Sequence, residues 1–184
     1  SPNQSGTSSI TIQFRDNSLT TNTTFQLTVN PINDAPEVTL PGGPANFVEG
    51  SASIVINTNA TVIDFDSPLL GGGQLTIAIS QNETPDDRLS IRHQGVGPGE
   101  IEVSGIGVAH EGVGIGTFSG GTSGSTPLVV LFNSSATPEA AQALLRNITF
   151  QNVSETPSLL SRGVSAVVAD GQGGISAPAT MTVT

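Results

Sequence analysis

The sequence predicts an all-β protein whose strands form an antiparallel sandwich, together with one short helix. Short segments that alternate apolar and polar residues recur along most of the 184 residues, which is the pattern of strands with one buried face. The chain has 22 glycines and 12 prolines, and such turn-forming residues separate the alternating segments. Short strands at regular spacing with such turns are typical of two packed antiparallel sheets.

The first element expected is a β-hairpin. Residues 9–15 and 24–29 both alternate apolar and polar side chains. We expect residues 16–22 to form the loop between them. An isolated hairpin is marginally stable in water, so this one should pack against another surface. Its apolar residues are Ile10, Ile12, Phe14, Phe25, Leu27 and Val29.

A stiff connector follows the hairpin at residues 30–36, Asn-Pro-Ile-Asn-Asp-Ala-Pro. Its prolines, Pro31 and Pro36, are five positions apart and disfavour both helix and regular sheet. We therefore expect a joint between two domains. Asn33 and Asp34 place an amide and a carboxylate in this joint, and their oxygens suit a hard cation.

After the connector, short alternating or apolar segments predict the strands of a longer domain. Residues 41–44 interrupt the first of them with prolines and glycines. Glycines recur at alternate positions between Gly105 and Gly116, which predicts either close packing or a flat exposed face. The expected strand segments are residues 38–40, 47–48, 52–57, 61–65, 74–80, 89–91, 101–103, 106–108, 113–115, 128–132 and 148–150.

The single helix is expected to begin at Thr137. Threonine is a good N-cap, Pro138 suits the first helical position, and Glu139 places an acid in the first turn. The helix should continue to about residue 146. Leu144 and Leu145 should then face the core.

The two ends of the chain repeat each other. A shift of about 154 positions aligns the apolar residues of the first predicted strand with residues 164–168, and those of the second with residues 179–183. We therefore predict that residues 1–34 are the C-terminal hairpin of a preceding repeat plus linker. Residues 35–184 should be nearly one whole repeat, and the chain should be a cut from a longer tandem array.

Charge and composition exclude several classes of function. Fifteen acidic residues against five arginines give a net charge of -10, which would repel a nucleic acid. The absence of cysteine removes disulfides and thiolate metal sites. No apolar run approaches a membrane span, so membrane insertion is not expected. We also expect no enzyme, because the two histidines and the glycine-rich stretch fit no catalytic or phosphate-binding motif.

Five motifs give the chain a likeness to a known family. They are Asn-Asp-Ala-Pro (33–36), Phe-Val-Glu-Gly (47–50), Asp-x-Asp (64–66), Leu-Leu-Arg-Asn-Ile-Thr-Phe (144–150) and Ala-Asp-Gly (169–171). Together they resemble the cadherin-like repeats of large bacterial surface adhesins, over essentially the whole chain. The resemblance implies an Ig-like, Greek-key β-sandwich in a tandem array with calcium at the joints. The chain lacks the Asp-Arg-Glu motif of classical cadherins, and its repeat is longer.

The resemblance also implies a set of Ca²⁺ ligands. Aspartates followed by Ser-Pro or by glycine also fit plain turns, so both interpretations stay open at this point. Asp16 matches Asp170 in the repeat and would serve the preceding joint. The implied ligands are Asn33, Asp34, Asp64, Asp66 and Asp170 at one end of the domain, and Glu49 at the opposite end for the next joint.

We therefore expect an extracellular calcium-binding repeat of a surface adhesin, at the cell surface or secreted. It would act as a rigid spacer or in calcium-dependent cell adhesion, with adjacent repeats of the same chain and a homophilic or cell-surface partner. The alternative is a carbohydrate-binding module of a secreted protein, although the chain has no tyrosine or tryptophan for sugar stacking. Because the apolar face of the hairpin would otherwise be bare, we also expect a dimer through residues 1–34.

Overall fold

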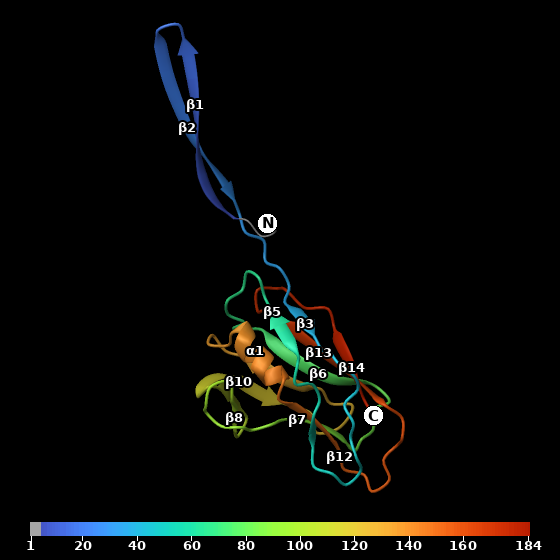
Figure 1. The fold of residues 1–184 in the computed structure, drawn as a ribbon. Coiled ribbons are helices and arrows are strands. Elements are labelled where there is room, and N and C mark those ends of the chain that lie inside the picture. Colours follow the sequence, from blue (N-terminus) through green and yellow to red (C-terminus); the bar gives the residue numbers. More distant parts are fainter. Residues whose placement is uncertain (1–4) are drawn as a thin grey trace. The chain divides into compact units, whose positions relative to one another are not determined.

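The computed structural model describes residues 5–184 and divides the chain into two compact units (Figure 1). The boundary lies between Asn33 and Asp34, one residue before the division expected from the sequence. We call the part before this boundary the first unit and Asp34–Thr184 the second unit. Each is described by itself.

The first unit is a long two-stranded hairpin. Strand β1 (Gly6–Asp16) pairs antiparallel with β2 (Leu19–Val29) along their whole length. The predicted loop at residues 16–22 is wrong, because only Asn17 and Ser18 separate the strands. Asn17 has φ +42°, a left-handed conformation that asparagine tolerates better than most residues and that allows so short a turn.

The two faces of the hairpin differ in polarity: one carries all the large apolar side chains of the strands together with Ser8, Asp16, Thr21 and Thr23, and the other is wholly polar. Pairing of Ile10 with Phe25 and of Ser9 with Gln26 fixes which residues share a face. Every residue of both strands is exposed, and the large apolar side chains are 37% to 75% exposed. The apolar face carries Ile10, Ile12, Phe14, Leu19, Phe25, Leu27 and Val29, and the polar face carries Thr7, Ser9, Thr11, Gln13, Arg15, Thr20, Asn22, Thr24, Gln26 and Thr28.

The second unit is an all-β sandwich with one short helix, which confirms the predicted fold class. Its helix α1 (Pro138–Leu145) lies between β11 and β12 in the chain. The strands are β3 (Glu37–Thr39), β4 (Ile54–Val55), β5 (Thr61–Ile63), β6 (Gln74–Gln81), β7 (Asp87–Ile91), β8 (Ile101–Ser104), β9 (Gly107–His110), β10 (Val113–Ser119), β11 (Leu128–Phe132), β12 (Ile148–Asn152), β13 (Arg162–Ala169) and β14 (Ala179–Val183).

The strands form three antiparallel sheets within the described part of the second unit. A seven-stranded sheet has the order β14-β13-β6-β11-β10-β9-β8, and a three-stranded sheet has the order β4-β12-β7. Strands β3 and β5 form a separate pair. The chain crosses from one large sheet to the other between β6 and β7, between β7 and β8, and again on either side of β12, so each large sheet contains strands that are distant in sequence.

The core lies between these sheets and contains the alternating residues that the sequence pattern predicts. In β6, Leu75 and Ile77 are buried, and in β13 Val164, Ala166 and Val168 are buried. The buried positions alternate with more exposed ones along both strands. Burial of this apolar surface is the main term that stabilises such a fold.

Helix α1 begins as predicted. Thr137 is its N-cap, and the Thr137 hydroxyl accepts a hydrogen bond from the backbone N–H of Ala140 at 3.1 Å. Leu144 and Leu145 are buried, as expected. No helix among residues 5–184 is long and apolar enough to cross a membrane.

Some expected strands are shorter because local side-chain bonds compete with the sheet. The segment 52–57 contributes only Ile54–Val55. Asn57 is buried, donates to the carbonyl of Pro41 at 2.9 Å and accepts from the N–H of Asn59, which turns the chain away from the sheet. The segment 47–48 forms no strand, although Ala45 makes a parallel bridge to Val183.

The glycine-rich segment between Gly105 and Gly116, a ribbon that includes β9 and most of β10, shows both expected features: close packing and open space. Gly105 and Gly112 have positive φ and lie in turns of the ribbon. A side chain at Gly116 would collide with the carbonyl of Leu131, so β10 and β11 approach closely at this point. Around Gly114, by contrast, the space is open.

Candidate metal centre

Two aspartates lie in a tight turn that follows strand β5. The carboxylate oxygen Oδ1 of Asp64 accepts hydrogen bonds from the backbone N–H groups of Ser67 at 2.8 Å and Asp66 at 3.3 Å. This is the local bonding by which aspartate stabilises a turn. It fixes the Asp64 side chain beside that of Asp66.

The chain at the start of the second unit is bonded to the same turn. The backbone N–H of Asp34 donates to Oδ2 of Asp66 at 3.0 Å. Asp34 and Asp66 are 32 positions apart in sequence, so this bond holds the end of the connector against the Asp-x-Asp turn.

Asp170 forms a third part of the site. It follows β13, is fully buried, and its Oδ1 accepts from the N–H groups of Gln172 at 2.6 Å and Gly174 at 3.0 Å. The side chain of Gln172 in turn donates to the hydroxyl of Ser67 at 2.8 Å. The loop after β13 is therefore bonded to the Asp-x-Asp turn.

Gly174 brings the Asp170 loop against the connector. A Cβ at Gly174 would collide with Oδ2 of Asp170 and lie 2.8 Å from the carbonyl oxygen of Asp34. Only glycine leaves room for these two oxygens to border the same backbone position. A carboxylate oxygen and a backbone carbonyl oxygen, both ligands that calcium accepts, thus lie beside the same face of Gly174.

The Asp-x-Asp turn holds carboxylate oxygens that the protein does not satisfy. Oδ2 of Asp64 and Oδ1 of Asp66 are buried and have no hydrogen-bond partner among the described residues. Burial raises the pKa of Asp64, and the neighbouring Asp66 carboxylate raises it further, against the lowering effect of the two backbone N–H groups. Buried negative charge without a partner is unfavourable, and a bound divalent cation would reverse this effect.

The structure brings together four of the six residues that the resemblance implied as ligands: Asp34, Asp64, Asp66 and Asp170 are joined by the bonds described above. Asn33 belongs to the first unit. Within residues 5–184, no three His, Cys, Asp or Glu side chains converge into a group that could hold a metal ion. A cation here would thus depend on the Asp64 and Asp66 pair together with backbone or amide oxygens.

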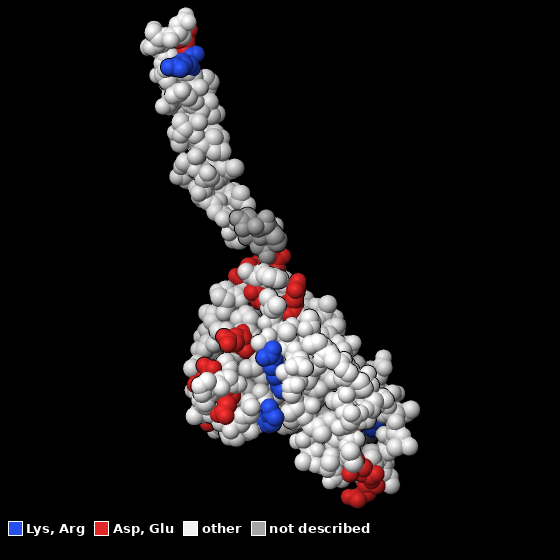
Figure 2. Space-filling model, in the orientation of Figure 1, with Lys and Arg blue, Asp and Glu red and all other residues white. Residues whose placement is uncertain are grey.

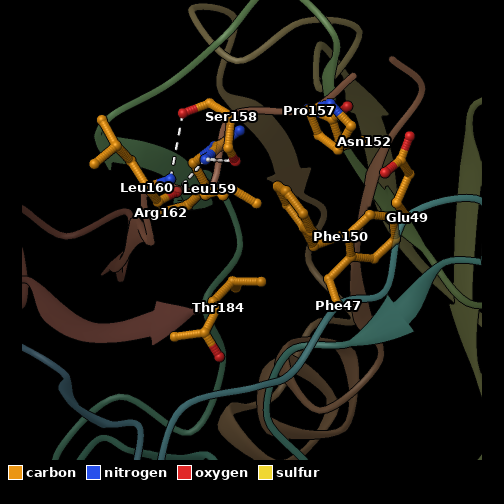
Figure 3. A pocket seen from close by; sticks show the side chains of 11 residues that line it. Phe47, Glu49, Phe150, Asn152, Pro157, Ser158, Leu159, Leu160, Arg162 and Thr184 are labelled. Atoms are coloured by element: carbon orange, nitrogen blue, oxygen red, sulfur yellow. Dashed lines mark hydrogen bonds between the residues drawn. The ribbon is translucent and has the colours of Figure 1, made fainter. Parts of the chain in front are cut away.

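Glu49 lies in a different place. It borders a cavity of about 160 Å³ together with Phe47, Phe150, Arg162 and Thr184 (Figure 3). Phe47 and Phe150 meet edge to face there, with ring centres 5.4 Å apart. Glu49 therefore has aromatic neighbours and is separate from the aspartate site.

Sequence reasoning missed the residues that assemble the site. Ser67, Gln172 and Gly174 connect the Asp-x-Asp turn, the Asp170 loop and Asp34, yet none of them belongs to a recognised motif. A signal was present for Gly174, because Gly171, Gly173 and Gly174 are unusually dense for a strand connection.

Comparison with known proteins gives no match: no family model, no curated protein and no solved structure is similar to this chain.

Proposed function

We propose that the chain is an extracellular, calcium-binding, cadherin-like repeat of a surface adhesin. It would act as a rigid spacer or in calcium-dependent adhesion. The observation that carries this proposal is the pair of buried, unsatisfied carboxylate oxygens on Asp64 and Asp66. Calcium takes six to eight oxygen ligands and favours aspartate carboxylates and backbone carbonyls.

The position of the site supports a role in rigidity. Asp66 already accepts a bond from Asp34, the first residue of the second unit. A cation bound by Asp64 and Asp66 would hold this backbone more firmly and so restrict the joint between the units. Asp170 would hold the loop after β13 against the Asp-x-Asp turn, and backbone or amide oxygens would complete the coordination of the cation.

Thermal unfolding with calcium and with a chelator tests the proposal. Extracellular modules bind calcium with Kd values of about 10⁻⁴ to 10⁻³ M, so 10 mM calcium should stabilise the folded state by about 1.4 to 2.7 kcal/mol. For a domain of this size that corresponds to a rise in Tm of roughly 3 to 10 °C. Asp66→Asn should remove most of the rise.

Glu49→Gln is the matched control, because it removes the same charge at a carboxylate outside the aspartate site. It should keep the calcium effect. Equal losses in the two variants, or no rise of Tm in the unmodified chain at 10 mM calcium, would contradict the proposal.

The second candidate, a carbohydrate-binding module, is favoured by a different observation. The β4-β12-β7 sheet has a hollow on its outer face, and six of the eight residues that line it are polar. This surface does not involve the aspartate site.

A further inference from the structure

Three of the five arginines border two adjacent hollows of the second unit. They form a cationic surface on a chain whose net charge is -10. Arg88 and Arg92 border one hollow, and Arg92 and Arg146 border the next. None of the three forms an ion pair within residues 5–184, where the ion pairs are Arg162–Asp87 and His110–Glu111. Figure 2 shows basic side chains in a short line on the face that carries α1 and β7.

The strand alternation of β7 places these arginines outward. Leu89 and Ile91 are buried in the core, so Arg88 and Ser90 point to the opposite face, and Arg92 continues the alternation just past the strand. Strand β12 pairs with β7 so that Gln151 lies opposite Arg88 and Thr149 opposite Ser90. The outer face of the sheet is therefore polar and locally cationic.

Two hollows lie along this surface and share Arg92. The first has a volume of about 460 Å³ and the second about 290 Å³. Their shared residue makes them neighbours, so together they could hold an extended ligand. The polar lining of the first is Ser53, Arg88, Ser90, Arg92, Thr149 and Gln151, and that of the second is Thr58, Arg92, Gln94, His110, Glu139, Gln142, Arg146 and Asn147.

Two of the three guanidinium groups, those of Arg92 and Arg146, are each held in place by a hydrogen bond from their own Nε. Nε of Arg92 donates to Oδ1 of Asn147 at 2.8 Å, and Nε of Arg146 donates to the carbonyl of Ala60 at 2.8 Å. Their terminal amino groups make no hydrogen bond to the described residues and are available to a ligand. An arginine fixed in this way loses less side-chain entropy when it binds a carboxylate or sulfate in a bidentate manner.

We propose that this groove, defined by Arg88, Arg92 and Arg146, binds an acidic saccharide chain, an inference that rests on the second candidate function, the carbohydrate-binding module. The arginines recognise its carboxylate or sulfate groups, and the serine, threonine, glutamine and asparagine side chains bond its hydroxyl groups. Recognition through charge explains how such a site works without tyrosine or tryptophan. Glu139 borders the second hollow, so anionic groups are bound in the first hollow and between Arg92 and Arg146.

Isothermal titration of the full chain with oligogalacturonate tests the proposal, with dextran sulfate as the second anionic probe and neutral dextran as the uncharged one. The titrations are made in a chelator, so that no metal bridges acid groups of the probe to the aspartate site. Binding of at least one anionic probe and not of neutral dextran is expected. The anion that binds identifies carboxylate or sulfate as the recognised group.

Matched variants locate the binding. Arg92→Gln should weaken it at least tenfold, because this residue serves both hollows. Ser90→Glu adds a negative charge at an exposed position with no hydrogen bond to lose, and should abolish binding while leaving Tm unchanged. Arg15→Gln, the same charge change in the first unit, should bind as the unmodified chain does.

Three results would overturn the proposal: no heat from either anionic probe at millimolar concentration, equal weakening in Arg15→Gln and Arg92→Gln, or inorganic sulfate binding as tightly as the saccharides. The last result would reduce the groove to a site for a single small anion. Because calcium is absent from these titrations, failure here leaves the calcium proposal untouched, and failure of the calcium proposal leaves this one untouched.

Discussion

Aspartates of the second unit that bury carboxylate oxygens differ in how those oxygens are bonded. Asp87 is fully buried, and its two oxygens accept from the N–H of Thr84 at 2.7 Å, Nε of Arg162 at 3.0 Å and Nδ2 of Asn152 at 2.6 Å. Asp64 and Asp66, by contrast, each keep one buried oxygen without a hydrogen bond. The Asp87 carboxylate is satisfied by the protein, and the Asp64 and Asp66 pair is suited to an external cation.

The unsatisfied carboxylate should be unfavourable when no metal is bound. Because burial raises the pKa of Asp64, its charged form is less favourable in the folded chain than in the unfolded one at neutral pH. Asp64→Asn keeps an oxygen that can accept from Ser67 and Asp66 while removing the charge. In a chelator its Tm should equal or exceed that of the unmodified chain, and calcium should no longer raise it.

Scanning calorimetry with and without calcium measures both effects. Glu37→Gln removes an exposed carboxylate on β3 and should leave both midpoints as they are. If Asp64→Asn lowers the midpoint in the chelator, the carboxylate stabilises the turn by itself and the argument for a cation loses its basis.

At the scale of elements, the buried ion pair between Asp87 and Arg162 joins the two large sheets. Asp87 opens β7 in the three-stranded sheet, and Arg162 opens β13 in the seven-stranded sheet. Their ion pair has side chains that are 0% and 5% exposed. Arg162 also donates to the carbonyls of Ser158 and Leu160, so the segment before β13 is held as well.

Removing one partner of this pair should be costly, because the other charge stays buried. We expect Asp87→Asn to lower the free energy of unfolding by about 3 to 5 kcal/mol. Urea denaturation followed by circular dichroism gives this value directly. Glu83→Gln, an exposed neighbour in sequence, should change it by less than about 0.5 kcal/mol. A loss below about 1 kcal/mol in Asp87→Asn would show that the pair does not hold the sheets together.

The elements that sequence reasoning found were those with a local signal. Two examples are the alternation of Leu75, Ile77 and Ile79 and the helix cap at Thr137. Each can be recognised from a few neighbouring residues, and both are present in the structure. The hairpin turn was misplaced because residues 19–23 are mostly threonine and asparagine, which resemble loop residues. They form a strand because they pair with the alternating residues of β1.

The sites depended on information that no local pattern carries. Asp64 and Asp66 became candidate ligands because two carboxylates stand in one short motif. The arginine groove was missed, because Arg92 and Arg146 come to border one hollow only through the pairing of β7 with β12, the strand that follows α1. The bond that links Asp34 to Asp66 likewise joins positions that are distant in sequence.

At the scale of the whole molecule, the two units differ in how they bury apolar surface. The second unit encloses its core between sheets, whereas the first unit exposes a face rich in large apolar side chains opposite a polar one. The residues of β13 that match this face in the repeat, Val164, Ala166 and Val168, are buried. Contiguous exposed apolar surface of this kind marks an interaction site.

We expect this face to pair with the same face of a second copy. Light scattering over increasing protein concentration should show a dimer, and Phe25→Thr should shift the molecule toward the monomer by removing apolar surface at the centre of the face. Gln26→Thr, on the polar face, should leave the dimer intact. A shortened chain that begins at Asp34 should be monomeric, and a monomer for the full chain at high micromolar concentration would refute the pairing.

The parallel bridge between Ala45 and Val183 has a mechanical consequence. Three backbone hydrogen bonds join the two segments: Ala45 N–H to Thr182 at 2.9 Å, Thr184 N–H to Ala45 at 2.8 Å and Phe47 N–H to Thr184 at 2.7 Å. Because the segments run in the same direction, a pulling force applied between residues 34 and 184 slides one past the other. The bonds then bear the load together in shear instead of opening one after another, and a surface tether made of such units would resist stretching at its domain termini.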